Sequence, residues 1–392
     1  MTRRRSGRRI AGIPLRTIVA AELVGAALLL ATDVSVIGGI VLVAAAAAVA
    51  VAIVMPVRGL RPGSWLAVLA GYATRRRTFT ASGSGPSDPI GEPAAVSLPP
   101  EVRALFPGIT ATEQLTRGAG RLGLVHWNGT WNCIVAAGPG DPDVLRLGGP
   151  ETLPVERVVA AVAGAGLALD AVTVVAQTLV GDPDRLGGGP LAAVAGELGA
   201  TGRLVRGRQT WFTVRIDPVA AGGAITARGG GVTGLARLAA AAVGRIVSEL
   251  AGAGLAAEPL GAEAAGRAMA AALLQPPAAE GQPARWIESL SGVASAQVHH
   301  RCFAVTSWSD RSLAELAATT GYGLTVAHEV RGLSGGAAEL RTVLRLSALS
   351  STQLDRGTTR LRRAARSAGV GLRPLRAQQL AGLRLTVPAG QR

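Results

Sequence analysis

The chain of 392 residues contains no lysine, two cysteines and few aromatic residues. Cys133 and Cys302 are too few for a disulfide framework, and their spacing is unlike that of zinc ligands. A Walker loop is excluded because that phosphate cradle requires a lysine. With aromatic residues at 3%, the chain also lacks the mixture of basic and stacking side chains that is typical of nucleic-acid binding. We therefore expect no nucleic-acid partner.

The net charge of +15 is carried entirely by arginine and is concentrated in two places. Residues 1–77 hold eleven arginines against Glu22 and Asp33, and residues 351–376 hold seven against Asp355. Long hydrophobic stretches explain the first group, because arginines mark the cytoplasmic ends of membrane helices. The second group predicts one basic helix.

The strongest signal is residues 34–57, which contain no charged residue and exceed the roughly 20 residues that a membrane-spanning helix needs. Residues 13–31 form a second apolar stretch, interrupted by Glu22. A signal peptide is the alternative reading of this stretch, but another apolar run follows it at once. Arginines flank both outer ends, so the positive-inside rule places both chain termini and the main domain in the cytosol. We expect a two-pass anchor in the cytoplasmic membrane, with spans at about 13–31 and 36–56.

Glu22 lies inside the first expected span, where a charge costs on the order of 3 kcal/mol unless it faces protein or water. It can lie near the interface or be protonated. It can also contact a partner helix, because small residues such as Gly25 would allow a second helix to approach closely. Glu22 and Gly25 are therefore candidate helix-contact residues.

The remaining chain is divided by composition. A basic cytosolic segment at residues 1–12 precedes the anchor, and residues 57–80, basic at both ends, are expected to lie along the membrane interface. Residues 81–100 are rich in proline, glycine and serine and are typical of a linker. A cytosolic domain is expected to follow, with a first half at residues 101–280 and a second half at 281–392.

The stretch "HWNGTWNCIVAAG", residues 126–138, raises the question of an active site. Asn128-Gly129 between two apolar runs predicts a tight β-hairpin turn. On such a strand Cys133 is best read as a small buried hydrophobe. His126 has no neighbouring carboxylate in the sequence, so it is read as a structural residue.

The order of expected elements repeats along the domain. Each half begins with a hairpin and a cysteine-containing strand, followed by a helix, two strands, a longer helix and a Gly-Leu tail. This pattern is typical of a β-α-β-β-α-β unit. The sequence thus predicts an α+β fold, with two transmembrane helices followed by a domain built from an internal duplication.

The only candidates for catalysis are two Asp-Pro-Asp triplets, each after an expected strand. Paired carboxylates there could bind a divalent metal and a nucleotide-sugar diphosphate, as in a membrane-tethered transferase. Such triplets are also common turn sequences, and no further acid, base or phosphate-binding group accompanies them. We therefore predict no catalytic, cofactor-binding or metal-binding residues, and keep the transferase as the alternative. The triplets are Asp141–Asp143 and Asp182–Asp184.

The basic helix expected near the C-terminus places arginines at spacings of four and three, on one face. Such a face is ordinarily solvated. Because the domain is expected to be tethered to the membrane, it is also a candidate surface for anionic lipid or for an acidic partner. The residues are Arg356, Arg360, Arg363 and Arg366.

This layout resembles the EccE family of the ESX, or type VII, secretion system of actinobacteria. The resemblance rests on the two expected spans, the linker, the motif V-x-W-x-G-x-W and the block "LRAQQLAGLRLTVPAG" at residues 375–390. It implies a non-enzymatic subunit without cofactors, which assembles in the membrane with EccB, EccC and EccD, the EccC ATPase supplying the energy. The motif residues are Val125, Trp127, Gly129 and Trp131.

Overall fold

The structure is a computed structural model that divides into two compact units, Met1–Arg75 and Arg76–Arg392. Each unit is considered by itself. The described residues are 9–10, 13–14, 22, 24–27, 36–54, 62–74, 78–80, 95–116, 120–138, 157–160, 167–180, 206–274, 284–295, 298–307, 316, 323–331 and 339–389.

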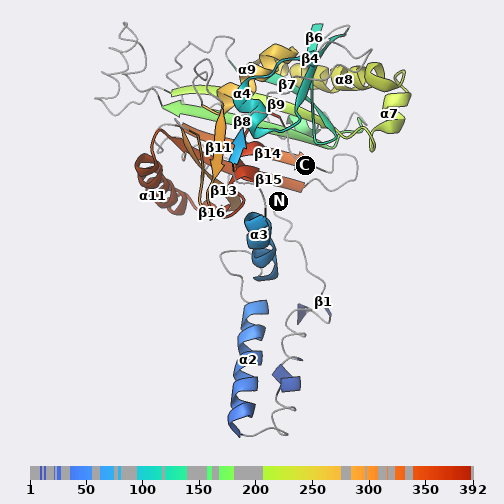
Figure 1. The fold of residues 1–392 in the computed structure, drawn as a ribbon. Coiled ribbons are helices and arrows are strands. Elements are labelled where there is room, and N and C mark those ends of the chain that lie inside the picture. The colour runs from blue at the N-terminus through green and yellow to red at the C-terminus, as the bar shows by residue number, and fades with distance from the viewer. Residues whose placement is uncertain are drawn as a thin grey trace. The chain divides into compact units, whose positions relative to one another are not determined.

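The first unit contains a short hairpin and two described helices (Figure 1). Strand β1 (Arg9–Ile10) pairs antiparallel with β2 (Ile13–Pro14). Residues 13 and 14, at the start of the first expected span, belong to β2, and residues 22 and 24–27 are helical; the rest of that span lies outside the described residues. Helices α2 (Val36–Val54) and α3 (Pro62–Thr74) follow.

Helix α2 falls within the uncharged run and has 19 residues, which corresponds to roughly 28 Å at about 1.5 Å per residue. Within the described residues, however, only α8 (Gly231–Gly252) is long and apolar enough to count as a candidate span, and Val36–Ala47 counts as a shorter apolar segment. Helix α8 buries one side against the domain and carries Arg237 and Arg245 on the other, as a core helix does. The two-pass anchor stays a prediction.

The second unit is built on one sheet of 14 strands in which every pairing is antiparallel. Mixed helices and a large antiparallel sheet confirm the α+β class. The main path of the sheet is β3-β11-β12-β13-β15-β14-β8-β9-β7-β6-β5-β4, with β10 paired to β7 and β16 paired to β13.

The first half of the domain runs from β4 to α9, and its longer elements follow the expected hydrophobic periods. Its elements are β4 (Ala95–Val96), α4 (Pro100–Leu105), β5 (Thr110–Thr116), β6 (Gly120–Trp127), β7 (Thr130–Gly138), β8 (Ala171–Val180), β9 (Arg206–Ile216), α7 (Gly222–Thr226), α8, β10 (Ala256–Pro259) and α9 (Ala262–Ala272).

The second half runs from β11 to α12 and also includes β3 (Thr78–Thr80), which pairs with β11. Its other elements are β11 (Arg285–Glu288), β12 (Val293–Ala294), β13 (His299–Ser307), β14 (Gly323–Arg331), β15 (Glu339–Ala348), α11 (Ser351–Ser367), β16 (Gly371–Pro374) and α12 (Gln379–Leu385).

The two halves have the same strand order. In the first, β8-β9-β7-β10 are neighbours, and in the second, β14-β15-β13-β16 are neighbours. In chain order each half reads 2-3-1-4, which is the order of the split βαβ motif. The halves join where β8 pairs with β14 over nine residues, from Ala171↔Arg331 to Leu179↔Gly323. We call this pairing the seam.

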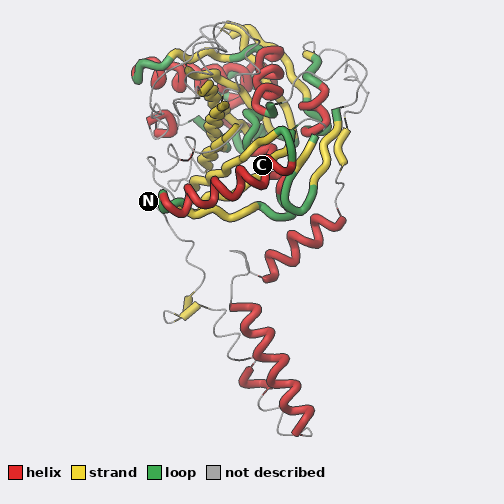
Figure 2. Tube along the Cα trace, turned by 90° about the vertical axis from the view of Figure 1, so that its left-hand side faces the viewer, coloured by secondary structure: helices red, strands yellow, loops and turns green. Residues whose placement is uncertain are grey.

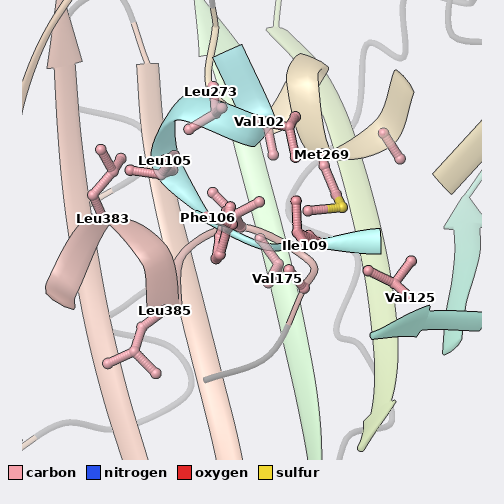
Figure 3. Packing of buried hydrophobic residues seen from close by; sticks show 14 of the residues in the cluster. Val102, Leu105, Phe106, Ile109, Val125, Val175, Met269, Leu273, Leu383 and Leu385 are labelled. Atoms are coloured by element: carbon pink, nitrogen blue, oxygen red, sulfur yellow. The ribbon is translucent and has the colours of Figure 1, made fainter. Parts of the chain in front are cut away.

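Helices cover both faces of the sheet (Figure 1 and Figure 2). On one face, α4, α9 and α12 share a single apolar cluster that draws residues from both halves. Figure 3 shows its centre, where Phe106 and Ile109 lie beside Met269 of α9 and Leu383 and Leu385 of α12. On the other face the core is divided, because α8 packs on the first half and α11 on the second.

Two expected boundaries differ from the structure. Thr78–Thr80, placed by sequence in the interfacial segment, forms the edge strand β3, because Phe79 packs against the shared apolar cluster. The expected linker also ends early, since β4 begins at Ala95 and α4 at Pro100. Strands of two or three residues are too short to show an alternating pattern, which is why the sequence did not reveal them.

Candidate functional site: the seam and the surfaces around it

The hairpin of the opening motif forms as predicted. Asn128 and Gly129 have φ values of 50° and 74°, and Trp127 pairs with Thr130 across the turn. Cys133 lies on β7 and is fully buried, and burial raises the pKa of its thiol to about 12. A thiol that stays protonated is a poor nucleophile. The prediction that Cys133 is a small buried residue on a strand is therefore confirmed.

Arg384 of α12 lies among three aromatic rings that come from distant parts of the chain. Its guanidinium carbon is 5.3 Å from the ring centroid of Trp127, 5.7 Å from that of Phe79 and 6.0 Å from that of Phe106. Its Nε donates a hydrogen bond to the carbonyl oxygen of Leu105 at 2.8 Å. Cations over ring faces are attracted by the ring quadrupole. We call these four side chains the Arg384 cluster.

The Arg384 cluster joins two motifs that are far apart in the sequence. Trp127 belongs to V-x-W-x-G-x-W, and Arg384 belongs to the block at residues 375–390. Trp127 also packs edge-on against Phe106, with ring centroids 5.1 Å apart, and donates from Nε1 to the carbonyl oxygen of Pro107 at 3.2 Å. These motif residues therefore hold the two halves and β3 together.

A first buried polar group crosses the seam. Arg215 of β9 is 1% exposed and donates to Asp170 at 2.5 Å and to Glu329 of β14 at 2.8 Å. Glu329 is 2% exposed and also accepts from Arg331 at 2.9 Å. Because Arg215 belongs to the first half and Glu329 to the second, the ion pair links the halves. A charge that lost its partner here would remain buried, at a large cost.

A second buried polar group lies further along the same strands. Arg345 of β15 is fully buried and donates to the Thr325 hydroxyl at 2.9 Å and to the carbonyl oxygen of Ala272. Gln177 of β8 donates to the same carbonyl at 2.9 Å. Burial lowers the pKa of Arg345 to about 10, so its guanidinium stays charged at neutral pH. Again the partners come from both halves.

The central residues of both polar groups are buried, which favours a role in fixing how the halves pair: Arg215, Glu329, Gln177 and Arg345. Buried ion pairs contribute little net stability compared with apolar residues, but they penalise arrangements in which a partner is missing. Gln177 and Arg345 each also keep polar atoms without a hydrogen-bond partner in the structure. The polar residues of the seam thus help to fix the register of β8 against β14 and the orientation of the two halves.

The basic helix forms as predicted, and the structure places all four named arginines on its exposed side. Helix α11 begins after Ser350, whose side chain accepts from the backbone of Gln353 as an N-cap, and it turns Leu354, Leu361 and Ala365 toward the sheet. Five arginines of the helix are exposed, the four expected ones and one more: Arg356, Arg360, Arg363 and Arg366, with Arg362.

Sequence reasoning missed three neighbours of this face. Arg362 was counted among the arginines of residues 351–376 but was not assigned to the exposed face. Its guanidinium carbon lies 5.8 Å from the ring centroid of Phe303. Arg301 of β13 donates to Thr358 at 3.0 Å and pairs with Asp355 at 2.9 Å. Arg376 is close enough to Arg362 to act on it electrostatically. Only tertiary contacts bring Arg301 and Arg376 to the helix, so no local pattern could have found them.

The structure says little about the remaining residues singled out by sequence, which are Glu22, Gly25 and the aspartates of the two Asp-Pro-Asp triplets. Glu22 is exposed in the first unit, and a side chain added at Gly25 would meet no described atom within 4 Å. Asp141, Asp143, Asp182 and Asp184 lie outside the described residues. In the described ranges, three or more His, Cys, Asp or Glu side chains do not gather in a way that could hold a metal ion.

Fold and site together define an α+β protein whose two similarly ordered halves are locked across a polar seam. Residues 204–305 match the model of the family described as "Putative type VII ESX secretion system translocon, EccE". The match covers about a quarter of the chain, from just before β9 into β13, and so crosses from one half to the other. It confirms the resemblance to the EccE family, a component of type VII secretion. No curated protein matched the chain significantly.

Proposed function

We propose that the chain is a non-catalytic assembly subunit of a type VII secretion complex, anchored in the cytoplasmic membrane by two spans with both termini in the cytosol. The observation that carries the proposal is the seam. A buried ion pair between the halves penalises other arrangements of the two halves and so supports a fixed shape, and the Arg384 cluster fastens the edge strand β3 to the same domain.

The partners in this proposal are EccB, the EccC ATPase and EccD, joined in a higher-order hetero-oligomer. The family match supports membership of the translocon, and the partner names follow from the resemblance. Glu22 and Gly25 are proposed to contact a neighbouring helix within the membrane, where small residues permit close packing.

Purification of the tagged chain in mild detergent tests the assembly. We expect it to bring down a large membrane complex that contains the other components. Carbonate washing should leave the chain in the membrane. A reporter that works only in the cytosol should be active when it is fused to the C-terminus of the chain. A monomer in every mild detergent would contradict the assembly role, while extraction by carbonate would contradict the anchor.

The transferase alternative is tested in cells that produce variants of the same tagged chain. Replacement of Asp141, Asp143, Asp182 and Asp184 by alanine should leave secretion unchanged if the chain is not an enzyme. Loss of secretion by a quadruple variant that still assembles would overturn the non-catalytic assignment, particularly if manganese-dependent binding of a nucleotide sugar disappeared with it.

A further inference from the structure

The strongest unassigned feature is a group of arginines on and around α11 in the second half. We define the arginine surface as the five exposed arginines of α11 together with Arg301 and Arg376. In residues 351–389 the sequence contains a single acid, Asp355, and that carboxylate is paired with Arg301 at 2.9 Å. Among the ion pairs of the described residues, none joins a carboxylate to an arginine of the helix itself.

These arginines are gathered closely enough to repel one another. Burial lowers the pKa of Arg362, and the nearby charges of Arg301, Arg376 and Arg366 lower it further. Folding has thus assembled like charges from α11, β13 and the segment after β16. Such a cluster attracts polyvalent or densely spaced anions.

The equivalent helix of the first half provides a contrast. Helix α8 exposes Arg237 and Arg245, but Arg237 is occupied by the carbonyl oxygen of Arg228 at 2.8 Å. Glu249 of the same helix pairs with Arg157 at 3.6 Å. Two helices at corresponding places in the sheet therefore differ in charge, so the excess on α11 is not a general property of the fold.

The path of the chain shows which half is connected to the membrane-proximal segment. Only three residues, all arginines, separate the last residue of α3 from the first residue of β3. Strand β3 enters the sheet beside β11, in the second half. The half that carries the arginine surface is therefore the half that the chain enters directly from the segment that follows the anchor.

We propose that the arginine surface binds the anionic phospholipid headgroups of the membrane in which the chain is anchored. The proposal rests on the proposed anchor. Anionic headgroups are spread over the membrane surface, so they can pair with a row of arginines without a shaped pocket. The three arginines between α3 and β3 add positive charge that attracts the same headgroups. An acidic protein is the other possible occupant and is separated by the test below.

The test uses the full chain in lipid nanodiscs, with a fluorophore on Thr359→Cys of α11 and a quencher on the lipid headgroups. The native cysteines stay unlabelled, because both are buried and burial raises their pKa to about 12. A matched label on Ser248→Cys of α8 is the control. We expect quenching at α11 in discs that contain phosphatidylglycerol and little in phosphatidylcholine, with no such difference at α8.

Salt and substitutions then separate electrostatics from general proximity. Raising the salt from 0.1 M to 1 M shortens the screening length from about 10 Å to about 3 Å and should abolish the quenching. Each of the substitutions R356Q, R360Q and R363Q should weaken the lipid contact roughly fivefold. The triple variant carries all three. The matched variant R245Q on α8 should leave it unchanged.

The possible failures are distinguishable. A chain that resists carbonate but shows equal quenching in both lipids overturns the lipid contact and leaves the anchor intact. Loss of the other secretion components from the triple variant, without any lipid contact, assigns the surface to an acidic protein. A chain extracted by carbonate overturns the anchor; it is then tested by flotation with phosphatidylglycerol vesicles, where unaltered binding by the triple variant would also overturn the arginine surface.

Discussion

His300 is the residue whose burial has the clearest consequence in solution. It is fully buried on β13, and its Nδ1 lies 2.9 Å from the Ser347 hydroxyl. The opposite ring nitrogen, Nε2, has no hydrogen-bond partner in the structure. The ring of Trp286 is 5.7 Å away. Burial, followed by the charges of Arg345 and His299, holds the pKa of His300 well below its usual value.

This residue should make the fold sensitive to acid. In the unfolded chain His300 gains a proton as the pH falls below about 6.5, whereas in the folded chain it stays neutral. The unfolded state then binds more protons, so the free energy of unfolding should fall by up to about 1.4 kcal/mol for each pH unit below 6.5. Denaturant titrations between pH 7.5 and 5 measure the slope. His300→Gln should flatten it, and an unchanged slope would show that His300 is not responsible.

At the scale of elements, α12 is held against β13 by a close approach at Gly382. A side-chain carbon added there would lie 2.6 Å from the Cβ of Cys302 and 2.7 Å from a methyl carbon of Leu375. The first of these atoms cannot rotate away. Helix α12 also carries Arg384, so its distance from the sheet sets the position of the Arg384 cluster.

A pair of glycine-to-alanine variants tests this packing. Gly382→Ala should lower the free energy of unfolding by about 1–3 kcal/mol, as overpacking does. Gly244→Ala on α8 should instead raise it by up to about 1 kcal/mol, because nothing lies within 4 Å of the added carbon and alanine is the better helix former. Denaturant unfolding compares them directly. Equal effects of the two substitutions would mean that α12 does not approach β13 this closely.

At the scale of the whole domain, the ion pair between Arg215 and Glu329 decides whether the two halves behave as one body. Glu329→Leu leaves the buried guanidinium of Arg215 without its partner in the second half and should cost about 3–5 kcal/mol. The double variant with Arg215→Leu should cost less than the sum of the single variants, because neither Arg215 nor Glu329 is then left as a buried charge without the other.

The exposed pair Arg267–Glu263 on α9 is the matched control for this double-mutant cycle. Its coupling should be at most about 0.5 kcal/mol, as is usual for exposed helix pairs. The seam pair should show about 1–3 kcal/mol, measured by denaturant unfolding. A coupling across the seam no larger than that of the control would contradict the view that it locks the halves together.

The elements of the domain could largely be predicted from the sequence, because they depend on local periodicity. The predicted basic helix forms as α11, Ser351–Ser367, within the arginine-rich residues 351–376, and Asn128-Gly129 makes the predicted turn. Alternating apolar residues and a turn dipeptide act over a few residues, so they can be read directly. The exposed arginines of α11 were found for the same reason.

The sequence by itself determined the α+β class, the hairpin, the order of the longer strands and of helices α8 and α11, and the place of the basic helix. Tertiary structure alone decided that Arg384 meets three aromatic rings, that Arg215 pairs with Glu329 and that Thr78–Thr80 becomes an edge strand. The contacts of Arg384 and Arg215 join residues that are more than a hundred positions apart. The strand at Thr78–Thr80 is too short to show an alternating pattern. Their partners are chosen by strand pairing and packing, which no local pattern encodes.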